Sequence, residues 1–211
     1  MKRGLFITLE GNDGAGKTTM AKKALEYLQK KGYRAIYTRE PGGSMIAEKI
    51  RTILLDPENT KMDAITEAIL YAASRRQHLV EVVLPALEEG TIVLCDRFID
   101  SSLAYQGEGR KLGMDAIEQL NQFAIQGCMP DLTLFLAIDE KTSQARLKAR
   151  DEKKDRLELE EEAFHQAVRR GYEKLLKKYP ERIRAIDASQ DLEDVEADVI
   201  DAIEKVLHVQ S

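Results

Sequence analysis

The feature that most restricts the fold is the segment GNDGAGKT at residues 11–18, which fills the pattern G-x-x-x-x-G-K-T. The apolar run LFITLE at 5–10 precedes it and is typical of a short buried strand. The run MAKKALEYLQK at 20–30 follows it and is rich in helix formers. A glycine-rich turn between a strand and a helix directs backbone N–H groups and the positive helix end toward an anion. The pattern predicts a phosphate-binding loop. A glycine turn without a ligand is the alternative, which the complete motif in this setting disfavours.

Three side chains of this loop have separate expected roles. Lys17 can reach the β- and γ-phosphates of a nucleotide, and the Thr18 hydroxyl can ligate Mg²⁺. Asp13 is unexpected, because a carboxylate within a phosphate cradle repels phosphates. We expect Asp13 either to face away from them, toward a second ligand, or to be a solvated turn residue. The predicted nucleotide-binding residues are Gly11, Asn12, Asp13, Gly14, Ala15, Gly16, Lys17, Thr18 and Thr19.

The rest of the chain alternates strand-like and helical patterns, which predicts an α/β fold whose parallel sheet has helices on both faces. The expected strands are 5–10, 34–38, 91–95, 132–138 and 182–187. The expected helices are 17–31, 45–55, 64–89, 114–126, 141–150, 159–178 and 192–207. Because the sequence has no internal repeat, low-complexity tract or flexible linker, we expect residues 1–211 to form one domain.

Composition disfavours several classes of function. The net charge of −5 argues against nucleic acid as a main partner. The longest apolar runs are the length of strands, which predicts no membrane span. Cys95 and Cys128 are too few for a disulfide framework and lack metal-ligand spacing, so we expect buried free thiols in a reducing cytoplasm. The three histidines also lack a metal-ligand pattern.

Charged residues lie at the expected carboxyl ends of strands, where ligands of parallel α/β sheets bind. Arg39 follows the second expected strand, and Asp96 and Arg97 follow the third. Asp96 can hold Mg²⁺ through water there, or it can be a turn carboxylate that ends the strand. Lone arginines are usually solvated, but two at this edge suggest a second anionic group facing the triphosphate. Arg51 and Arg75, on expected helices, extend the set.

The segment RLKARDEKKDRLE at 146–158 is rich in charge and interrupts two helical patterns. Such a run is usually a solvated face. Its few apolar residues and its position predict a short mobile lid at about 150–157. An arginine brought in by a closing lid could neutralise charge on the transferring phosphoryl group.

The segment TKMD at 60–63 matches the guanine-reading pattern [NT]KxD of regulatory GTPases. It follows LDPEN and precedes a long expected helix, whereas the GTPase motif follows a late strand. The third expected strand is followed by DRFI rather than D-x-x-G. We therefore interpret TKMD as a loop and helix start, with Asp63 as the N-cap.

In combination, the motifs of the chain resemble those of the thymidylate kinase family in its bacterial form. These motifs are EGNDGAGKTT (10–19), REPGG (39–43), AASRRQH (72–78), DRFIDSSLAYQG (96–107), PDLTLFL (130–136) and DRLE (155–158). They span most of the chain in the family's order, and a generic P-loop kinase would lack REPGG and SSLAYQG. The resemblance implies a P-loop NTPase fold with a five-stranded parallel sheet, a homodimer, and transfer of a phosphoryl group from ATP·Mg²⁺ to dTMP.

The resemblance also implies roles at the acceptor phosphate and sugar. Arg39 and Arg97 would clamp the acceptor phosphate, with Arg51 close to them. Asp13 would face the dTMP sugar and its 3′-hydroxyl, which explains a carboxylate in this loop. A cis peptide bond between Glu40 and Pro41 is a further expectation from the resemblance.

At the base, the family's pattern places Tyr71 in a stack on thymine and Arg75 in a hydrogen bond to it. Ser102 and Gln106 would help Arg75. The implied substrate-binding residues are Asp13, Arg39, Pro41, Arg51, Tyr71, Arg75, Arg97, Ser102, Tyr105 and Gln106.

Catalysis needs no general base, because the acceptor phosphate is already an oxyanion, so positioning and charge neutralisation carry it. The loop has Gly14 and no arginine, which resembles the bacterial type, whose catalytic arginine comes from the lid. Both Arg150 and Arg156 are candidates, because this lid lacks the glycine found in some relatives. The expected catalytic residues are Lys17, Asp96, Arg97, Arg150 and Arg156, with Thr18 and Asp96 at the metal.

Other functions stay open on the sequence. A nucleotide kinase acting on dUMP, on a thymidine analogue or on a nucleoside would share most of these residues. An ATP- or GTP-dependent switch would hydrolyse nucleotide slowly without an acceptor. A purely structural relative is disfavoured by the intact Lys17, Thr18 and Asp96.

Overall fold

The structure, a computed structural model, describes residues 3–149 and 155–210. Its sheet has five strands, in the order β2-β3-β1-β4-β5, and every neighbouring pair is parallel. The strands are β1 (Phe6–Glu10), β2 (Ala35–Arg39), β3 (Ile92–Asp96), β4 (Leu132–Ala137) and β5 (Ile183–Asp187). All expected strands are confirmed within a residue or two. Because β1 lies between β3 and β4, the loop after β1 leaves the centre of the sheet, where the strand order changes direction.

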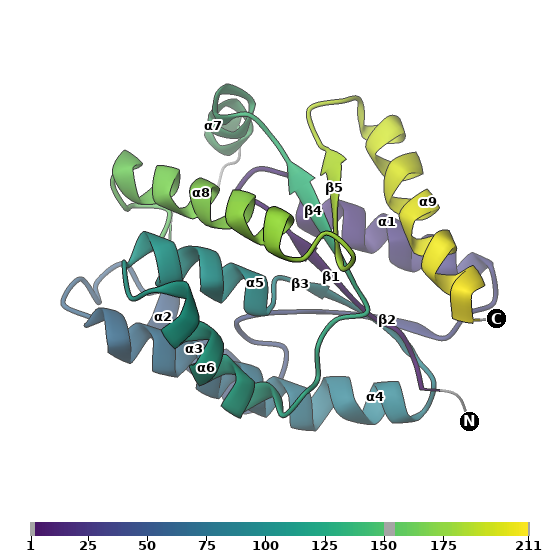
Figure 1. The fold of residues 1–211 in the computed structure, drawn as a ribbon, viewed down its shortest axis with the longest axis horizontal. Coiled ribbons are helices and arrows are strands. Elements are labelled where there is room, and N and C mark those ends of the chain that lie inside the picture. Colours follow the sequence, from purple (N-terminus) through teal and green to yellow (C-terminus); the bar gives the residue numbers. More distant parts are fainter. Residues whose placement is uncertain (1–2, 150–154, 211) are drawn as a thin grey trace.

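Helices cover both faces of the sheet (Figure 1). On one side, α1 (Lys17–Lys30) and α9 (Leu192–Gln210) pack on a core that includes Ile7 and Leu9 of β1. The opposite face contributes Phe6 to a second core under the remaining helices. Alternate residues of a strand point to opposite faces, so a strand that is buried on both sides supplies both cores.

The second core is covered by a longer set of helical segments. They are α2 (Met45–Leu55), α3 (Ala64–His78), η1 (Leu79–Val83), α4 (Leu84–Glu88), α5 (Ile99–Ser102), η2 (Leu103–Gly109), α6 (Met114–Ile125) and α8 (Glu162–Lys178). Between β4 and α8 lies α7 (Glu140–Ala149), beyond the carboxyl end of β4 (Figure 1). The two η segments are π-helical turns within longer helices.

Three helix predictions need correction. The expected helix 64–89 is interrupted by the π-helical turn at 79–83, and the expected helix 159–178 begins at Glu162. The motif DRFIDSSLAYQG, for which no helix was expected, is helical from Ile99 onward. Its two serines and its glycine are weak helix formers, and tertiary packing overrides that preference. The packing is close, because a Cβ on Gly171 of α8 would lie 2.8 Å from Ala104 Cα.

Several local predictions are confirmed. Asp63 is the N-cap of α3, and its carboxylate accepts a hydrogen bond from Thr66 N at 2.9 Å. The bond between Glu40 and Pro41 is cis. Cys95 and Cys128 are buried free thiols. Within the described residues, no helix is both long and apolar enough to cross a membrane.

Candidate functional site

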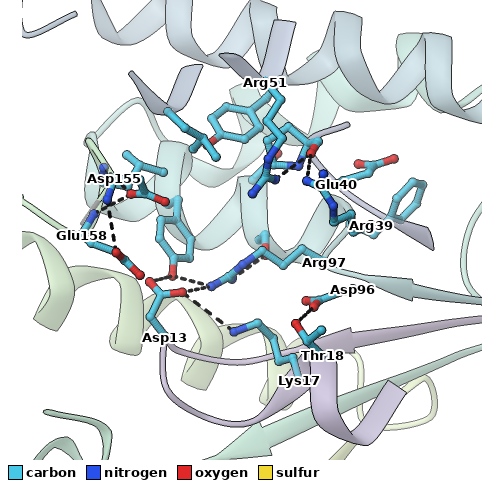
Figure 2. A pocket seen from close by; sticks show the side chains of 18 of the residues that line it. Asp13, Lys17, Thr18, Arg39, Glu40, Arg51, Asp96, Arg97, Asp155 and Glu158 are labelled. Atoms are coloured by element: carbon cyan, nitrogen blue, oxygen red, sulfur yellow. Dashed lines mark hydrogen bonds and ion pairs between the residues drawn. The ribbon is translucent and has the colours of Figure 1, made fainter. Parts of the chain in front are cut away.

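A cavity of about 750 Å³ lies at the carboxyl ends of β1, β2 and β3. Figure 2 shows Lys17 and Thr18 on one side of it, Arg39 and Arg51 on the other, and Arg97 between them. The predicted site residues that line it are Asp13, Gly14, Gly16, Lys17, Thr18, Thr19, Arg39, Pro41, Arg51, Tyr71, Arg75, Asp96, Arg97, Ser102, Tyr105 and Gln106. The structure thus brings together segments that are far apart in the sequence.

The backbone of the loop at 11–18 takes the conformation that its glycines allow. Gly11 has φ 142°, and a Cβ there would lie 2.6 Å from the Leu136 carbonyl oxygen. Lys17 Nζ crosses the loop and donates to the carbonyls of Gly11 at 3.1 Å and Asn12 at 2.9 Å. Of the predicted nucleotide-binding residues, Gly11, Asn12 and Ala15 do not line this cavity, and Asn12 lines a neighbouring one. Burial, followed by the charge of Arg97, lowers the pKa of Lys17 to about 8.

Thr18 and Asp96 meet directly, although they are 78 residues apart. Thr18 Oγ1 donates to Asp96 Oδ2 at 2.5 Å. Thr18 is the second residue of α1, and Asp96 is the last residue of β3. A hydroxyl and a carboxylate at one point are hard oxygen ligands of the kind that Mg²⁺ prefers. The pair fits the metal role expected for it.

Arg97 is the centre of the polar contacts in the cavity. Its Nη2 contacts Asp13 Oδ1 at 2.5 Å and donates to Tyr105 OH at 3.1 Å. Burial on its own raises the pKa of Asp13, but the charges of Arg97 and Lys17 outweigh it and lower that pKa to about 2. The Asp13 carboxylate is therefore ionised and is held by Arg97 and Tyr105.

Glu10 accepts hydrogen bonds from the residues that follow Arg97 in the chain, and sequence reasoning did not identify it. Its carboxylate accepts hydrogen bonds from the backbone N–H groups of Phe98 at 2.8 Å and Ser101 at 3.1 Å, and from Tyr172 OH at 2.9 Å. These bonds fix the turn in which Arg97 has a left-handed φ of 69°. Burial, and then the charge of Asp100, raise the pKa of Glu10. The one available signal was a carboxylate at the end of a mostly apolar strand.

Arg39 and Arg51 meet at the loop after β2. Arg51 Nη1 donates to the Pro41 carbonyl at 2.8 Å, and Arg39 Nη1 donates to the same oxygen at 3.4 Å. Arg39 also pairs with Glu48 at 3.1 Å. Burial, followed by the charge of Arg39, lowers the pKa of Arg51. Two neighbouring guanidinium groups facing one volume form a site that an anion would stabilise.

Tyr71 and Arg75 of α3 form a further part of the cavity wall. The two residues are four apart on α3, so they project from one helix face. Arg75 Nη1 donates to Ser102 Oγ at 3.0 Å. Gln106 Nε2 donates to Glu67 Oε1 at 2.9 Å. An aromatic ring beside a fixed guanidinium is an arrangement that can hold a flat polar ring.

The two expected lid arginines differ. Arg150 lies outside the described residues. Arg156 does not line the cavity, and it is 7% exposed. Its Nη2 pairs with Glu67 at 2.7 Å, and its Nε donates to the Leu54 carbonyl at 2.9 Å. Arg146 of α7, which the sequence placed in the same charged run, does line the cavity.

Comparisons with known proteins agree with one another. The family model described as thymidylate kinase matches residues 9–199. The thymidylate kinase of Oceanobacillus iheyensis is 54% identical over 97% of this chain and 92% of its own length. That of Pediococcus pentosaceus is 53% identical over 97% of this chain and 99% of its own. The crystal structure of the Ehrlichia chaffeensis thymidylate kinase matches with a TM-score of 0.78 at 34% identity, covering 96% of this chain and 99% of that one.

Proposed function

The chain belongs to the thymidylate kinase family, and we propose that it transfers the γ-phosphoryl group of ATP to dTMP, giving dTDP and ADP. The main support is a single cavity lined by three parts: the phosphate loop, the arginines, and the pair Tyr71 and Arg75. An ATP phosphate chain, an acceptor phosphate and a pyrimidine would fit these parts in that order.

On the donor side, the loop amides and Lys17 hold the phosphates of ATP. Thr18 and Asp96 hold Mg²⁺, which neutralises phosphate charge when bound. Their hydrogen bond already places both oxygens at the mouth of the loop. Lys17 exchanges its bonds to the loop carbonyls for bonds to phosphate oxygens.

On the acceptor side, Arg39, Arg51 and Arg97 bind the dTMP phosphate and hold it in line with the γ-phosphoryl group. The acceptor oxygen is already anionic, so the chain supplies no base. Asp13 faces the sugar, and its contacts with Arg97 and Tyr105 support that role because they fix the carboxylate in place. Tyr71 stacks on the base and Arg75 donates to its edge.

For the lid, we propose that Arg156 has a positioning role. Its side chain contacts α2 and α3 through Leu54 and Glu67. Arg150 stays a candidate from the sequence for the arginine that contacts the transferring group.

We also propose that two copies of the chain pair through α2 and α3. The exposed apolar residues on these helices are Met45, Ile46, Ile53, Ile65 and Ile69. Exposed apolar side chains on two helices that pack against each other are typical of a protein interface.

The alternatives make different predictions. A GTP-dependent switch would need TKMD near the nucleotide, but none of residues 60–63, all of them described, lines the cavity. A kinase for a different acceptor would keep the arginines and fail on dTMP.

A coupled ADP-release assay with dTMP, dUMP, dGMP and water as acceptors tests the proposal. We expect rapid ADP release with dTMP, and much slower release with dGMP or with water alone. Equal rates with and without dTMP would contradict a dTMP kinase.

A further inference from the structure

Arg75 lines the cavity, yet its guanidinium is held from several sides and its side chain is only 2% exposed. Its Nε donates to Glu40 Oε2 at 2.7 Å, and its Nη1 donates to Ser102 Oγ at 3.0 Å. Its central carbon lies 5.0 Å from the centre of the Phe98 ring. A guanidinium held in this way cannot turn without breaking charged hydrogen bonds in a buried place. The directions of its remaining N–H groups are therefore fixed.

Asn121 of α6 is a further hydrogen-bond partner of the Arg75 guanidinium and lies outside the cavity lining. Its Oδ1 accepts a hydrogen bond from Arg75 Nη1, and its Nδ2 donates to the Ile117 carbonyl at 2.8 Å. The side chain is 1% exposed and does not line the cavity. Because both ends of the amide are bonded, Asn121 has one orientation, in which it offers oxygen to Arg75.

Glu40 is fixed by a second set of buried contacts. Its Oε1 forms a hydrogen bond with His78 Nδ1 at 2.9 Å, and His78 Nε2 faces Thr38 Oγ1 at 2.6 Å. A continuous buried polar chain therefore runs from β2 through α3 to α6, with Arg75 in the middle. Chains of this kind hold their members in place only while each has its partner.

We propose that Asn121 is a positioning residue that sets which pyrimidine base the site accepts. Among the described residues, Arg75 Nη2 has no hydrogen-bond partner, whereas Nη1 is taken up by Ser102 and Asn121. By holding Nη1, Asn121 leaves Nη2 as the donor available to a ligand in the cavity. The inference rests on the proposed function, because it assigns the determinant of its acceptor specificity.

The chemistry of the guanidinium gives the direction of the selection. An arginine offers donors and no acceptor. A carbonyl on the base edge, as in thymine or uracil, accepts from Nη2. An amino group at the same place, as in cytosine, sets a donor against a donor. Removing the Asn121 oxygen leaves Nη1 with Ser102 alone, so the guanidinium is held less firmly in its orientation and the selection weakens.

The test measures steady-state kinetics of Asn121→Leu and Asn121→Asp with dTMP, dCMP and ATP. Asn121→Leu removes the oxygen, and Asn121→Asp retains one for Arg75. For Asn121→Leu we expect KM for dTMP to rise roughly tenfold to a hundredfold and the preference for dTMP over dCMP to shrink. We expect KM for ATP to stay unchanged. Asn121→Asp should recover most of the dTMP affinity and preference.

Two controls separate positioning from general loss of structure. Ile125→Ala removes a buried side chain of the same helix, without any hydrogen bond to Arg75, and should lower Tm with both KM values unchanged. Gln122→Leu makes a matching change at an exposed neighbour of Asn121 and should change nothing. If Asn121→Leu does not fold, Asn121→Ala replaces it in the same measurements.

The outcomes are distinguishable. An unchanged KM for dTMP in the folded Asn121 variant overturns the inference. So does an equal rise in KM for dTMP and ATP, or the same dTMP defect in Ile125→Ala. A wild-type enzyme that does not phosphorylate dTMP overturns the proposed function instead, before any variant is compared.

Discussion

Lys17 is a buried cation whose pKa lies close to physiological pH. Burial and the charge of Arg97 lower it to about 8, so the free enzyme loses this positive charge as the pH rises past that value. We predict that kcat/KM for ATP falls about tenfold per pH unit above about pH 8. The fall in kcat should be smaller, because bound phosphates stabilise the ammonium form.

A pH series from about 7 to 9.5 at saturating dTMP measures both constants. Lys17→Ala is the control, and it should abolish transfer while circular dichroism shows an intact fold. A level kcat/KM across the whole range would show that Lys17 keeps its charge in the free enzyme.

The lowered pKa of Asp13 makes the stability of the folded protein depend on pH in the acid range. Its native pKa of about 2 is lower than the ordinary value of 3.8, so the native state binds this proton less readily than the unfolded chain. The stabilisation is present above about pH 4 and is lost as the pH falls toward about 2. We predict that it contributes about 2 kcal/mol to the free energy of unfolding at neutral pH.

Urea unfolding of the wild type and Asp13→Asn at several pH values checks this prediction. The difference between their unfolding free energies should narrow below about pH 4. If the difference in unfolding free energy between the two proteins stays constant down to about pH 2.5, the ion pair of Asp13 with Arg97 is not its source.

At the scale of elements, Arg156 joins the segment after α7 to two helices. Besides the Glu67 ion pair, its backbone N–H donates to the Leu55 carbonyl at 3.2 Å at the end of α2. Glu67 is 0% exposed and also pairs with Arg110. Burial opposes ionisation of Glu67, but the bonds from Arg110, Gln106 and Arg156 outweigh it and lower its pKa. The carboxylate therefore holds η2, α3 and Arg156 together.

We predict that Arg156→Leu lowers the free energy of unfolding by about 1–3 kcal/mol, because Glu67 loses one of several buried donors. The value of kcat should fall by less than about tenfold, since Arg156 lies outside the cavity. Thermal melting and initial rates measure the two effects.

Arg110→Leu is the matched control, because it removes another donor to the same carboxylate. It should lower stability by a similar amount. A loss in kcat of about a thousandfold with unchanged stability in Arg156→Leu would instead identify Arg156 as the arginine that contacts the phosphoryl group.

At the scale of the whole molecule, both helices proposed to pair carry exposed apolar residues. Ile65 is 58% exposed and Ile69 is 51% exposed, on the side of α3 away from Glu67 and Arg75, which are buried. The same helix thus carries the residues proposed to bind the base on one face and the proposed interface on the other.

We predict that Ile69→Lys shifts the chain from dimer to monomer, because it places a charge in an apolar interface. Sedimentation velocity at micromolar concentration measures the shift, and the melting curve shows whether the fold remains. Leu192→Lys is the control: Leu192 is also exposed but begins α9, which covers the opposite face of the sheet. A wild-type chain that already sediments as a monomer would contradict the proposed pairing.

The sequence by itself determined the positions of the five strands, the phosphate loop and the helix cap at Asp63. Each depends on neighbours along the chain: apolar runs of strand length, glycines between a strand and a helix, and a capping side chain three residues before its donor. The strand order and the helical form of 99–109 did not follow from such patterns. They depend on packing between distant segments, as between η2 and α8.

In the site, the motifs located Lys17, Thr18, Asp96 and Arg97, which all line the cavity. The partners that hold them were decided by the tertiary structure. Tyr172 reaches Glu10 across 162 residues, and Asn121 reaches Arg75 across 46. A buried polar side chain must find a partner wherever the fold provides one, and no local pattern encodes that choice. For the same physical reason, Arg156 looked like a lid residue in the sequence and is a buried partner of Glu67 in the fold.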